Sequence, residues 1–397
     1  MARIRTLDEA QVEGKRVLLR VDFNVPLRGK TVLDDTRIRA CLPTIEYLLD
    51  HKARLIILSH LGRPAGEGYQ KEFSLGPAAF KLEELIGRPV QMAKDVTGPD
   101  AQEKAASLAD GEVLLLENLR FDAREKAKDP AFVKELASLG EVFVNDAFGA
   151  AHRDHASISG IPEHLPSYAG LLLQKEVQTL SGMLDNPKRP FVAVLGGSKV
   201  SDKVAIINSL IDKCDTLIIG GGMCFTFLLA QGHPVGNSLK ELEWIGRSAL
   251  MLERAEEQGV KILLPVDVVA ADRFSPDAAT VTVDVDSIPD DMMGLDIGPE
   301  TDALFSSAIK EAGTVFWNGP MGVFEMDAFA AGTREVAQAC ADNSEADTII
   351  GGGDSVSAVN KFGLADKMTF ISTGGGASMK LVEGTPMPGV EALKEGD

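Results

Sequence analysis

The chain has 397 residues, of which 45% are hydrophobic and 25% charged, a balance typical of a globular protein with two domains. Its net charge is −19, divided as −3 over residues 1–170 and −16 over the remainder. So acidic a chain is a poor partner for nucleic acid. The first ten residues lack the apolar core of a signal peptide, and no apolar run reaches the roughly 18 residues that a membrane helix needs. We therefore expect a cytoplasmic protein without nucleic-acid or membrane partners.

The four cysteines are scattered along the chain, and no two of them form a CxxC pair. A disulfide framework or a zinc site requires closer grouping than this. The sequence therefore predicts reduced, buried thiols at Cys41, Cys214, Cys224 and Cys340.

Short apolar runs rich in β-branched residues recur along the chain, with room for a helix between them. Because these runs are apolar throughout, they suit strands buried on both faces of a parallel sheet. In chain order, the expected strands are Val17–Val21, Leu55–Leu58, Val113–Leu116, Val142–Val144, Phe191–Leu195, Thr216–Ile219, Ile262–Leu264, Thr314–Trp317, Thr348–Ile350 and Met368–Ile371. Helices are expected between them, among others at Ala78–Ile86, Pro130–Ser138, Leu242–Gln258 and Ala328–Cys340. The alternation predicts an α/β fold with two Rossmann-like three-layer αβα domains, mostly parallel sheets and right-handed crossovers.

The two halves meet at residues 171–189, where a helix is expected. Leu173, Val177, Leu180 and Leu184 follow one face of a helix, and Pro187 and Pro190 end it. We expect this helix to join the domains. The expected divisions are 1–170, an interdomain helix and hinge at 171–189, 190–375 and a C-terminal segment 376–397.

Ligands of an open parallel sheet bind beyond the carboxyl ends of the strands, so the residues after each strand indicate the chemistry. In the first half, Arg63, Arg120 and Arg153 follow three different strands, and Arg37 lies in a nearby loop. Guanidinium groups bind phosphate and carboxylate through paired hydrogen bonds, so converging arginines indicate a small, multiply charged anion. His60 and His152 accompany them, either as ligand-binding or as structural histidines.

In the second half, the strands are followed by glycine-rich turns instead. These turns are Gly196-Gly197-Ser198-Lys199, Gly220-Gly221-Gly222-Met223, Asn318-Gly319-Pro320, Gly351-Gly352-Gly353-Asp354-Ser355 and Gly374-Gly375-Gly376. Glycine lets the backbone approach a ligand closely, and the helix that follows presents free N–H groups to an anion. Five such turns indicate a polyphosphate or nucleotide. A GxxxxGK[ST] P-loop and a full GxGxxG fingerprint are both missing, which disfavours the common NTPases and dinucleotide-dependent dehydrogenases.

Together these motifs resemble the phosphoglycerate kinase family along essentially the whole chain. The matching segments, in the family's order, are RVDFNVP (20–26), SHLGRP (59–64), ENLRF (117–121), NDAFGAAHR (145–153), LGGSKVSDK (195–203), GLDIGP (294–299), WNGPMGVFE (317–325), GGGDS (351–355) and STGGGAS (372–378). Each motif alone is moderately specific for that family, and nine motifs in the family's order are much more specific.

The resemblance implies reversible phosphoryl transfer between 1,3-bisphosphoglycerate with ADP and 3-phosphoglycerate with ATP, in glycolysis and gluconeogenesis, by a Mg²⁺-dependent monomer. It implies that 1–170 binds 3-phosphoglycerate through Asp22, Phe23, Asn24, Arg37, His60, Leu61, Gly62, Arg63, Arg120 and Arg153. It implies that 190–375 binds the nucleotide through Lys199, Lys203, Gly220, Gly221, Gly222, Met223, Gly294, Asn318, Glu325, Gly352, Gly353, Asp354 and Ser355, with Asp354 linked to the metal. Ser355 departs from the threonine common there but keeps a hydroxyl group. From about Gly376 the chain resembles a segment that packs back on the first domain.

The reaction that the resemblance implies needs groups that neutralise negative charge more than it needs a general base. The transition state spreads negative charge over the moving phosphoryl group, and the acceptor is already a carboxylate. The residues expected to neutralise that charge are Arg37, Lys199, Lys203, Gly353 and Gly375. The arginines and lysines lie in different domains, so hinge closure is expected, with exclusion of water.

Two other classes of protein are also two-lobed and α/β. A small-anion binding protein without catalysis should carry a signal peptide and has no need of glycine turns beside lysines. A NAD-dependent dehydrogenase should carry the missing fingerprint, followed by a suitably spaced acidic residue. The sequence fits both classes less well than it fits a kinase.

Overall fold

The structure is a computed structural model that describes residues 3–395. The chain forms two compact units, one comprising residues up to Gln178 together with those from Pro386 onward, the other Thr179–Thr385. The boundary between them falls inside helix α6 (Leu171–Asp185), where the sequence predicted an interdomain helix. The chain re-enters the first unit at Pro386 rather than at Gly376 as expected, because helix α13 (Gly376–Val382) belongs to the second unit.

The first unit is built on a six-stranded sheet in the order β5-β6-β4-β1-β7-β8, in which every neighbouring pair is parallel. Its strands are β1 (Arg16–Arg20), β4 (Arg54–Leu58), β5 (Val90–Met92), β6 (Val113–Leu115), β7 (Val142–Asn145) and β8 (Ser167–Ala169). The four strands expected from the apolar runs are confirmed. The two edge strands were missed because each has only three residues, and their sequences VQM and SYA carry polar side chains.

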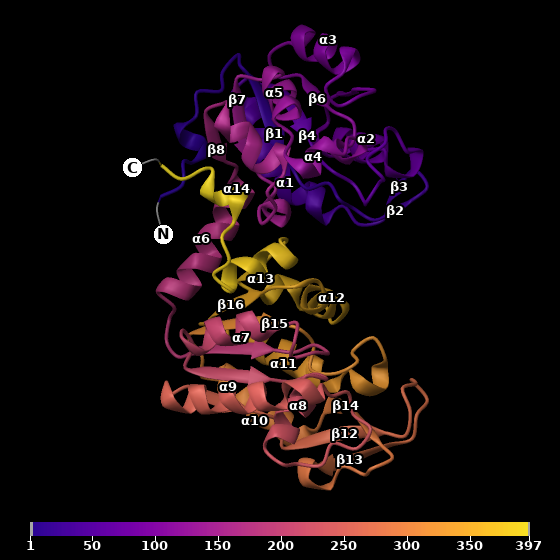
Figure 1. Ribbon diagram of the computed structural model, residues 1–397, viewed down its shortest axis with the longest axis vertical. Coiled ribbons are helices and arrows are strands. Elements are labelled where there is room, and N and C mark those ends of the chain that lie inside the picture. Colours follow the sequence, from indigo (N-terminus) through magenta and orange to yellow (C-terminus); the bar gives the residue numbers. More distant parts are fainter. Residues whose placement is uncertain (1–2, 396–397) are drawn as a thin grey trace. The chain divides into compact units, whose positions relative to one another are not determined.

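Helices cover both faces of this sheet (Figure 1). They are α1 (Thr36–Asp50), α2 (Gly76–Ile86), α3 (Pro99–Ser107), α4 (Arg124–Ala127) and α5 (Pro130–Ser138). Alternate strand residues point to opposite faces. Leu19 and Ile57 therefore join a core with α1 and α2, whereas Leu18 and Ile56 join a second core with α3 and α5. Burial on both faces explains why these strands are apolar throughout. A small hairpin of β2 (Leu27–Arg28) and β3 (Thr31–Val32) lies outside the sheet.

The second unit contains another parallel six-stranded sheet, in the order β11-β10-β9-β15-β16-β17. Its strands are β9 (Phe191–Leu195), β10 (Thr216–Ile219), β11 (Lys261–Leu263), β15 (Thr314–Asn318), β16 (Asp347–Ile350) and β17 (Phe370–Ile371), and all six were expected from the sequence. In chain order this is the 3-2-1-4-5-6 arrangement of Rossmann-like folds. The strand order reverses between β9 and β15, so a ligand crevice is expected at their carboxyl ends.

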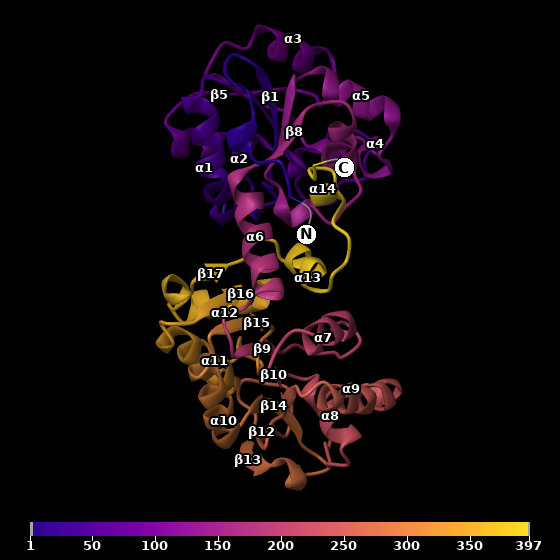
Figure 2. The same ribbon diagram turned by 90° about the vertical axis from the view of Figure 1, so that its left-hand side faces the viewer.

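Figure 2 shows the strands of this sheet with α10, α11 and α12 on one side and α7, α8 and α9 on the other. The helices are α7 (Val204–Ile211), α8 (Cys224–Ala230), α9 (Ile245–Glu257), α10 (Pro299–Lys310), α11 (Ala331–Asp342) and α12 (Gly353–Lys361). Trp317 of β15 is fully buried in the core that α10, α11 and α12 share with the sheet. Each unit is therefore a three-layer αβα structure, as predicted.

A second sheet in this unit, with the order β13-β12-β14, is antiparallel and was not predicted. It comprises β12 (Asp267–Ala271), β13 (Thr280–Asp284) and β14 (Met293–Ile297). The sequence TVTVD of β13 is mostly exposed, so it lacks the apolar run by which the buried strands were found. This sheet matters because it forms one wall of the cavity described below.

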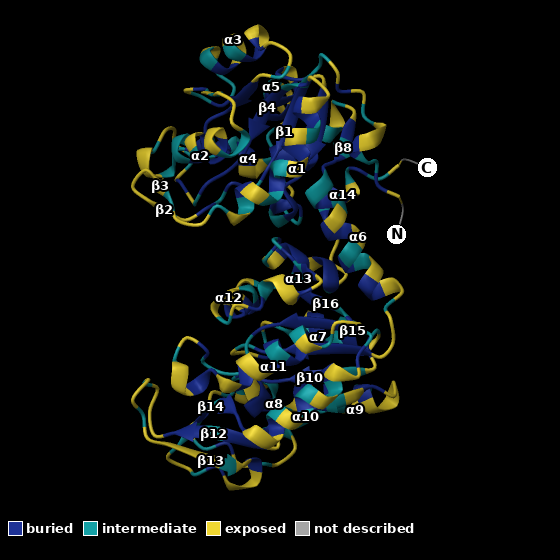
Figure 3. Cartoon of the chain, turned by 180° about the vertical axis from the view of Figure 1, so that it is seen from behind, coloured by how far each residue is buried: buried dark blue, intermediate teal, exposed yellow. Residues whose placement is uncertain are grey.

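Buried residues follow most strands of the two parallel sheets in Figure 3. All four cysteines are buried and free, which confirms the prediction of reduced thiols. Within residues 3–395, none of the helices has the length and apolar character needed to cross a membrane.

Candidate functional site

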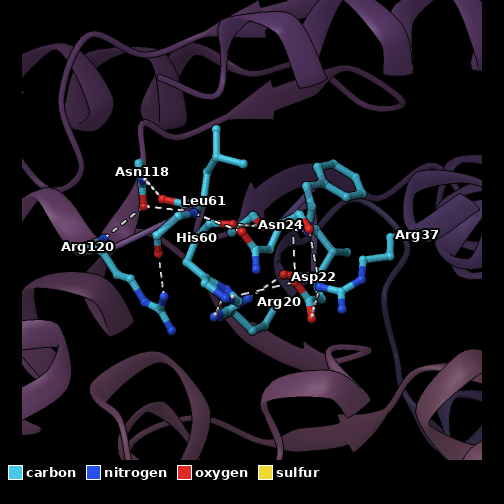
Figure 4. Close-up of polar contacts among 12 residues, drawn as sticks. Arg20, Asp22, Asn24, Arg37, His60, Leu61, Asn118 and Arg120 are labelled. Atoms are coloured by element: carbon cyan, nitrogen blue, oxygen red, sulfur yellow. Dashed lines mark hydrogen bonds and ion pairs between the residues drawn. The ribbon is translucent and has the colours of Figure 1, made fainter. Parts of the chain in front are cut away.

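The carboxyl ends of β1, β4 and β6 bring the predicted anion-binding residues of the first unit together (Figure 4). Asn24 Oδ1 accepts a hydrogen bond of 2.8 Å from the N–H of Gly62, so the loop after β1 holds the loop after β4. Gly62 has a φ of +63°, and a Cβ there would lie 2.4 Å from the ring of Phe73. Only glycine fits this position without displacing the aromatic ring.

Asn118 connects the loops after β4 and β6. Its side-chain oxygen accepts hydrogen bonds from the N–H groups of Leu61 and Arg120, and its amide nitrogen donates to the carbonyl of Leu61. The fully buried amide therefore sets the direction in which the chain carries Arg120, whose Nη1 donates to the carbonyl of Gly62. Burial, followed by the positive charges of Arg153 and Arg20, lowers the pKa of Arg120 to about 10. The guanidinium is still charged at neutral pH.

The arginines differ in how firmly they are held. Arg37 lies in the first turn of α1, and its Nη1 lies 3.1 Å from Asp22 Oδ2 and 3.2 Å from the carbonyl oxygen of Asn24. Arg153 is half-buried and lies close enough to Arg20, Arg120 and His60 to influence their pKa values. Arg63 is exposed. The converging positive charge that the sequence predicted is thus present in one unit.

His60 is 4% exposed at the centre of this cluster. Burial, and then the charges of Arg20, Arg120, Arg153 and Arg37, hold its pKa well below the ordinary value for histidine. It is therefore neutral at physiological pH. The role of His152, for which the sequence allowed either ligand binding or a structural part, is not decided by its position: the side chain is half-buried and interacts with other residues.

Three buried residues that support this site were quoted within motifs but given no role. Arg20 is 1% exposed and contacts His60, Asn118 joins two loops, and Glu117 accepts hydrogen bonds from the N–H groups of Leu75 and Asn118. A sequence cannot show that a motif residue points inward rather than toward a ligand. Their position next to ligand-facing residues was the available signal.

The second unit contains a cavity of about 570 Å³ at the strand-order reversal. Of the predicted nucleotide-binding residues, it is lined by Gly221, Gly222, Gly294, Glu325 and Asp354. Sequence reasoning missed further lining residues, notably Phe225, Asn237, Leu239 and Phe274. Leu239 and Phe274 are exposed large hydrophobic residues, and both lie on the wall of this cavity, where a bound ligand would cover them.

Two of the predicted residues stand behind the wall of this cavity rather than on it. Met223 is fully buried, and its N–H donates to the carbonyl of Gly197, which does line the cavity. A Cβ at Gly220 would lie 2.4 Å from the sulfur of Met321, another lining residue. Both positions therefore shape the cavity from behind.

The ends of β15 and β16 carry the polar groups next to the cavity. Asn318 Oδ1 contacts Lys203 Nζ, and its Nδ2 donates to the carbonyl of Gly351 over 2.7 Å. Gly352, with a φ of +89°, passes so near that a Cβ would lie 2.2 Å from Nδ2. The turn then opens α12, where Ser355 Oγ accepts from the N–H of Gly319. The hydroxyl of Ser355 is therefore used structurally.

The loop that carries Lys199 and Lys203 is held by Glu241. Its carboxylate accepts hydrogen bonds from the N–H of Ser201 at 3.0 Å and from the Ser201 hydroxyl at 2.6 Å. Burial acts to raise the pKa of Glu241, but these bonds outweigh it and the pKa lies below its ordinary value. Lys199 is exposed, whereas burial lowers the pKa of Lys203, with partial compensation from Asp354 and Asp202.

An arginine-rich anion site on one α/β unit and a glycine-walled cavity beside lysines on another fit the class of phosphotransferases that act between a nucleotide and a small acid. The family model described as phosphoglycerate kinase matches residues 7–385. A protein of Moorella thermoacetica named phosphoglycerate kinase is 55% identical over 395 residues, covering 100% of both chains. One from Synechococcus elongatus with the same name is 54% identical over 99% of this chain and 98% of its own.

Comparison with solved structures agrees with these sequence matches. The phosphoglycerate kinase of Coxiella burnetii superposes with a TM-score of 0.92 at 41% identity, and that of Pyrococcus horikoshii with a TM-score of 0.82 at 32% identity, each covering 98% of both chains. The chain belongs to the phosphoglycerate kinase family. The resemblance stated from the motifs is confirmed, and these matches support neither the binding-protein nor the dehydrogenase alternative.

Proposed function

We propose that the first unit binds 3-phosphoglycerate, that the second binds ADP or ATP, and that the named side chains carry the phosphoryl transfer between them. Membership of the family makes the chain a phosphotransferase with a carboxyl group as acceptor. The reversible reaction connects 1,3-bisphosphoglycerate and ADP with 3-phosphoglycerate and ATP. The observation that carries the assignment of the acid is the meeting of Arg37, Arg120 and Arg153 around His60.

The acid has a carboxylate at one end and a phosphate at the other, so it needs several cations at once. Asp22 and Asn24 position Arg37, Asn118 and Gly62 position Arg120, and Arg63 and Arg153 supply further charge. Phe23 and Leu61 are buried loop residues whose backbone connects these side chains. Arginine is suited to this site because its planar fork matches both carboxylate and phosphate.

The nucleotide fits the cavity of the second unit. Gly221, Gly222 and Gly294 have no side chains and so leave space for a base, and the exposed side chains of Phe274 and Leu239 border this space. Glu325 is exposed at the cavity wall and suits the ribose hydroxyls. Lys203, Asn318 and the opening turn of α12 at Gly353 lie where the phosphates would follow, with Lys199 exposed in the adjacent loop.

The residues also fit Mg²⁺. Asp354 is an exposed carboxylate in the first turn of α12 at the cavity wall, and within residues 3–395 no group of three or more His, Cys, Asp or Glu could hold a metal by itself. Mg²⁺ usually takes one or two carboxylates and completes its shell with water and substrate phosphates. Asp354 would therefore hold the ion, which neutralises phosphate charge when bound.

The reaction needs cations more than it needs a proton acceptor. In the direction that consumes ATP, the attacking group is already a carboxylate. Negative charge then spreads over the transferred group. Arg37, Lys203 and the backbone N–H groups near Gly353 and Gly375 are the groups that we assign to neutralise it.

Transfer requires the carboxylate of the acid and the terminal phosphate of the nucleotide to meet, so we infer that both ligands together draw the two units closed. Each ligand alone makes few contacts that differ between the open and closed forms, so it should shift the equilibrium between these forms less. Small-angle scattering should show a fall in radius of gyration with both substrates and a smaller change with either. A radius that stays fixed with both would exclude closure.

The activity is tested by a coupled assay in which NADH oxidation depends on both ATP and 3-phosphoglycerate. Turnover should require Mg²⁺ and both substrates, whereas binding of the acid without turnover would contradict the assignment. We further infer a cytoplasmic monomer, which sedimentation of the purified protein and fractionation of cells would test.

A further inference from the structure

A continuous chain of buried polar groups lies behind the anion site of the first unit. It comprises Glu125 of α4, Ser157, Arg20 at the end of β1 and His60 after β4, each at most 4% exposed. Every nitrogen of the Arg20 guanidinium has a partner in this chain or next to it. Nε donates to Ser157 Oγ over 2.8 Å, Nη1 donates to the carbonyl of Val21, and Nη2 lies 3.1 Å from His60 Nδ1.

The contact with His60 fixes where the proton of the imidazole resides. Arginine has only donors, so Nδ1 must accept with its lone pair and cannot carry a proton. In a neutral imidazole the single proton is then on Nε2. Figure 4 shows the side chain of Arg20, which is buried, meeting the His60 ring. Nε2 lies 3.9 Å from Asp22 Oδ1, which is beyond hydrogen-bond length.

The other end of the chain fixes Arg20. Glu125 is 1% exposed and accepts the Ser157 hydroxyl at 2.6 Å and the Ser157 N–H at 3.0 Å. The hydroxyl of Ser157 thus gives its only proton to Glu125 and is left to accept from Arg20. Burial lowers the pKa of Arg20, and the carboxylate of Glu125 is the strongest influence that opposes this. Glu125 therefore supplies a negative charge that offsets part of the cost of burying the guanidinium, although burial also raises the pKa of Glu125 itself.

We propose that Glu125, Ser157 and Arg20 are positioning residues that hold His60 in one neutral tautomer, with its proton on Nε2. His60 then presents a hydrogen-bond donor of fixed direction rather than a further positive charge. That the donor meets the bound acid rests on the function proposed above. The tautomer itself follows from the contacts within the first unit alone.

The charges around His60 favour this neutral donor over an imidazolium. Arg20 comes from β1, Arg37 from α1, Arg120 from the turn after β6 and Arg153 from the segment after β7, and all four disfavour a proton on His60. Asp22 faces the ring with the opposite charge, and it is paired with Arg37. At the far end, His155 Nδ1 lies 3.8 Å from Glu125, and burial, followed by the charges of Arg120, Arg153 and Arg20, lowers its pKa to about 4. Neither histidine adds positive charge at neutral pH.

The test is nitrogen NMR of the full chain with ¹⁵N-labelled histidine, in which the two ring nitrogens of each tautomer differ strongly in chemical shift. The chain has six histidines, and the spectrum of His60→Gln identifies the signals of His60. Between pH 6 and 8 we expect a protonated Nε2 and an unprotonated Nδ1. A proton on Nδ1, or an imidazolium at pH 7, overturns the proposal without any variant being needed.

Variants then test the chain that sets the tautomer. Arg20→Lys keeps the charge but loses the planar fork, and Glu125→Gln keeps the shape but loses the charge. In both we expect signals that move toward a mixture of tautomers. Glu135→Gln is the matched control, because Glu135 pairs with Arg124 at the half-exposed surface of the same region. If His60 in Glu125→Gln is indistinguishable from His60 in the control, Glu125 has no positioning role.

A titration with 3-phosphoglycerate separates the two claims. We expect the Nε2 proton signal to move on binding, and the affinity of Glu125→Gln for the acid to be weaker by roughly tenfold or more, as for a hydrogen bond to a charged group. An unmoved signal at saturating acid overturns His60 as its donor while the tautomer stands. A moved signal on Nδ1 overturns the tautomer while the binding assignment stands.

Discussion

Arg37 Nη1 lies 3.1 Å from Asp22 Oδ2, so the first turn of α1 is tied to the loop after β1 by an ion pair. The same nitrogen also donates to the carbonyl of Asn24, and two acceptors therefore fix its direction. The pair is partly buried, with side chains 35% and 13% exposed, so it is screened less than a surface pair. The geometry presents Arg37 as a positioned cation rather than a freely moving one.

Arg37→Ala should lower kcat by orders of magnitude, by analogy with the roughly 10³–10⁵ that arginine fingers contribute to phosphoryl transfer. Arg37→Lys should recover little, because lysine lacks the fork that reaches several acceptors at once. Arg39→Ala on the same helix is the control, since Arg39 pairs with Asp35 at the surface. An effect on KM alone would make Arg37 a binding residue only.

Asp354→Asn should weaken binding of the Mg²⁺-nucleotide complex by at least roughly tenfold and leave the affinity for 3-phosphoglycerate nearly unchanged. The reason is that Asp354 belongs to the cavity of the second unit, whereas the arginines belong to the first. Isothermal calorimetry with each ligand measures both affinities. Asp327→Asn, at an exposed carboxylate paired with Lys361, serves as control. Equal loss of both affinities would indicate a folding defect instead.

Glu241→Ala should raise KM for ATP by about three- to tenfold, because two hydrogen bonds that hold the loop of Lys199 and Lys203 are lost. Ser201→Ala removes only the hydroxyl bond and should have a smaller effect in the same direction. Steady-state kinetics at saturating 3-phosphoglycerate measures both. Glu243→Ala, at an exposed neighbouring carboxylate, should behave as the unaltered chain. If Glu241→Ala behaves like Glu243→Ala, the loop does not depend on this clamp.

The buried carboxyl of Asp146 should make stability depend on pH. Its Oδ1 accepts the N–H groups of Leu172 and Leu173 at the start of α6, and burial raises its pKa from 3.8 to about 7. The folded state therefore holds a proton that the unfolded state releases between these values. The stabilising contribution is complete below pH 3.8 and is lost as pH rises through 7.

Asp146→Asn keeps an acceptor oxygen and removes the charge. Its free energy of unfolding, relative to the unaltered chain, should therefore rise by on the order of 1–3 kcal/mol between pH 5 and pH 8. Urea denaturation at the two pH values measures this difference. A difference that does not change with pH would show that Asp146 stays ionised throughout.

The sequence was sufficient to predict the parallel sheets because their strands are buried on both faces. Leu18 and Leu19 contact opposite cores, so the run around them is apolar without interruption. The antiparallel sheet escaped prediction because the residues of β13 face solvent. The cavity was predicted only in part for the same reason, since Phe274 and Leu239 follow no periodic pattern and gain a meaning only in space.

For the anion site, the rule that ligands lie beyond strand ends identified the residues but not how deeply each side chain is buried. Arg20 ends β1 and Arg120 lies in the turn after β6, yet only the structure shows that Arg20 is buried behind His60. Hydrogen bonds between loops, such as that between Asn24 and Gly62, join residues far apart in sequence. No local pattern reports such contacts.

The division of the first unit between the two ends of the chain bears on the order in which the protein is made. Residues from Pro386 onward complete this unit: Met387, Val390 and Leu393 are buried, the N–H of Gly389 donates to the carbonyl of Ala151, and that of Arg5 to the carbonyl of Leu393. At roughly 5–20 residues per second, about 10–40 s of translation separate Gln178 from these residues. The unit that begins to emerge first from the ribosome is thus the last to receive all of its parts, because the whole second unit is synthesised before the C-terminal segment.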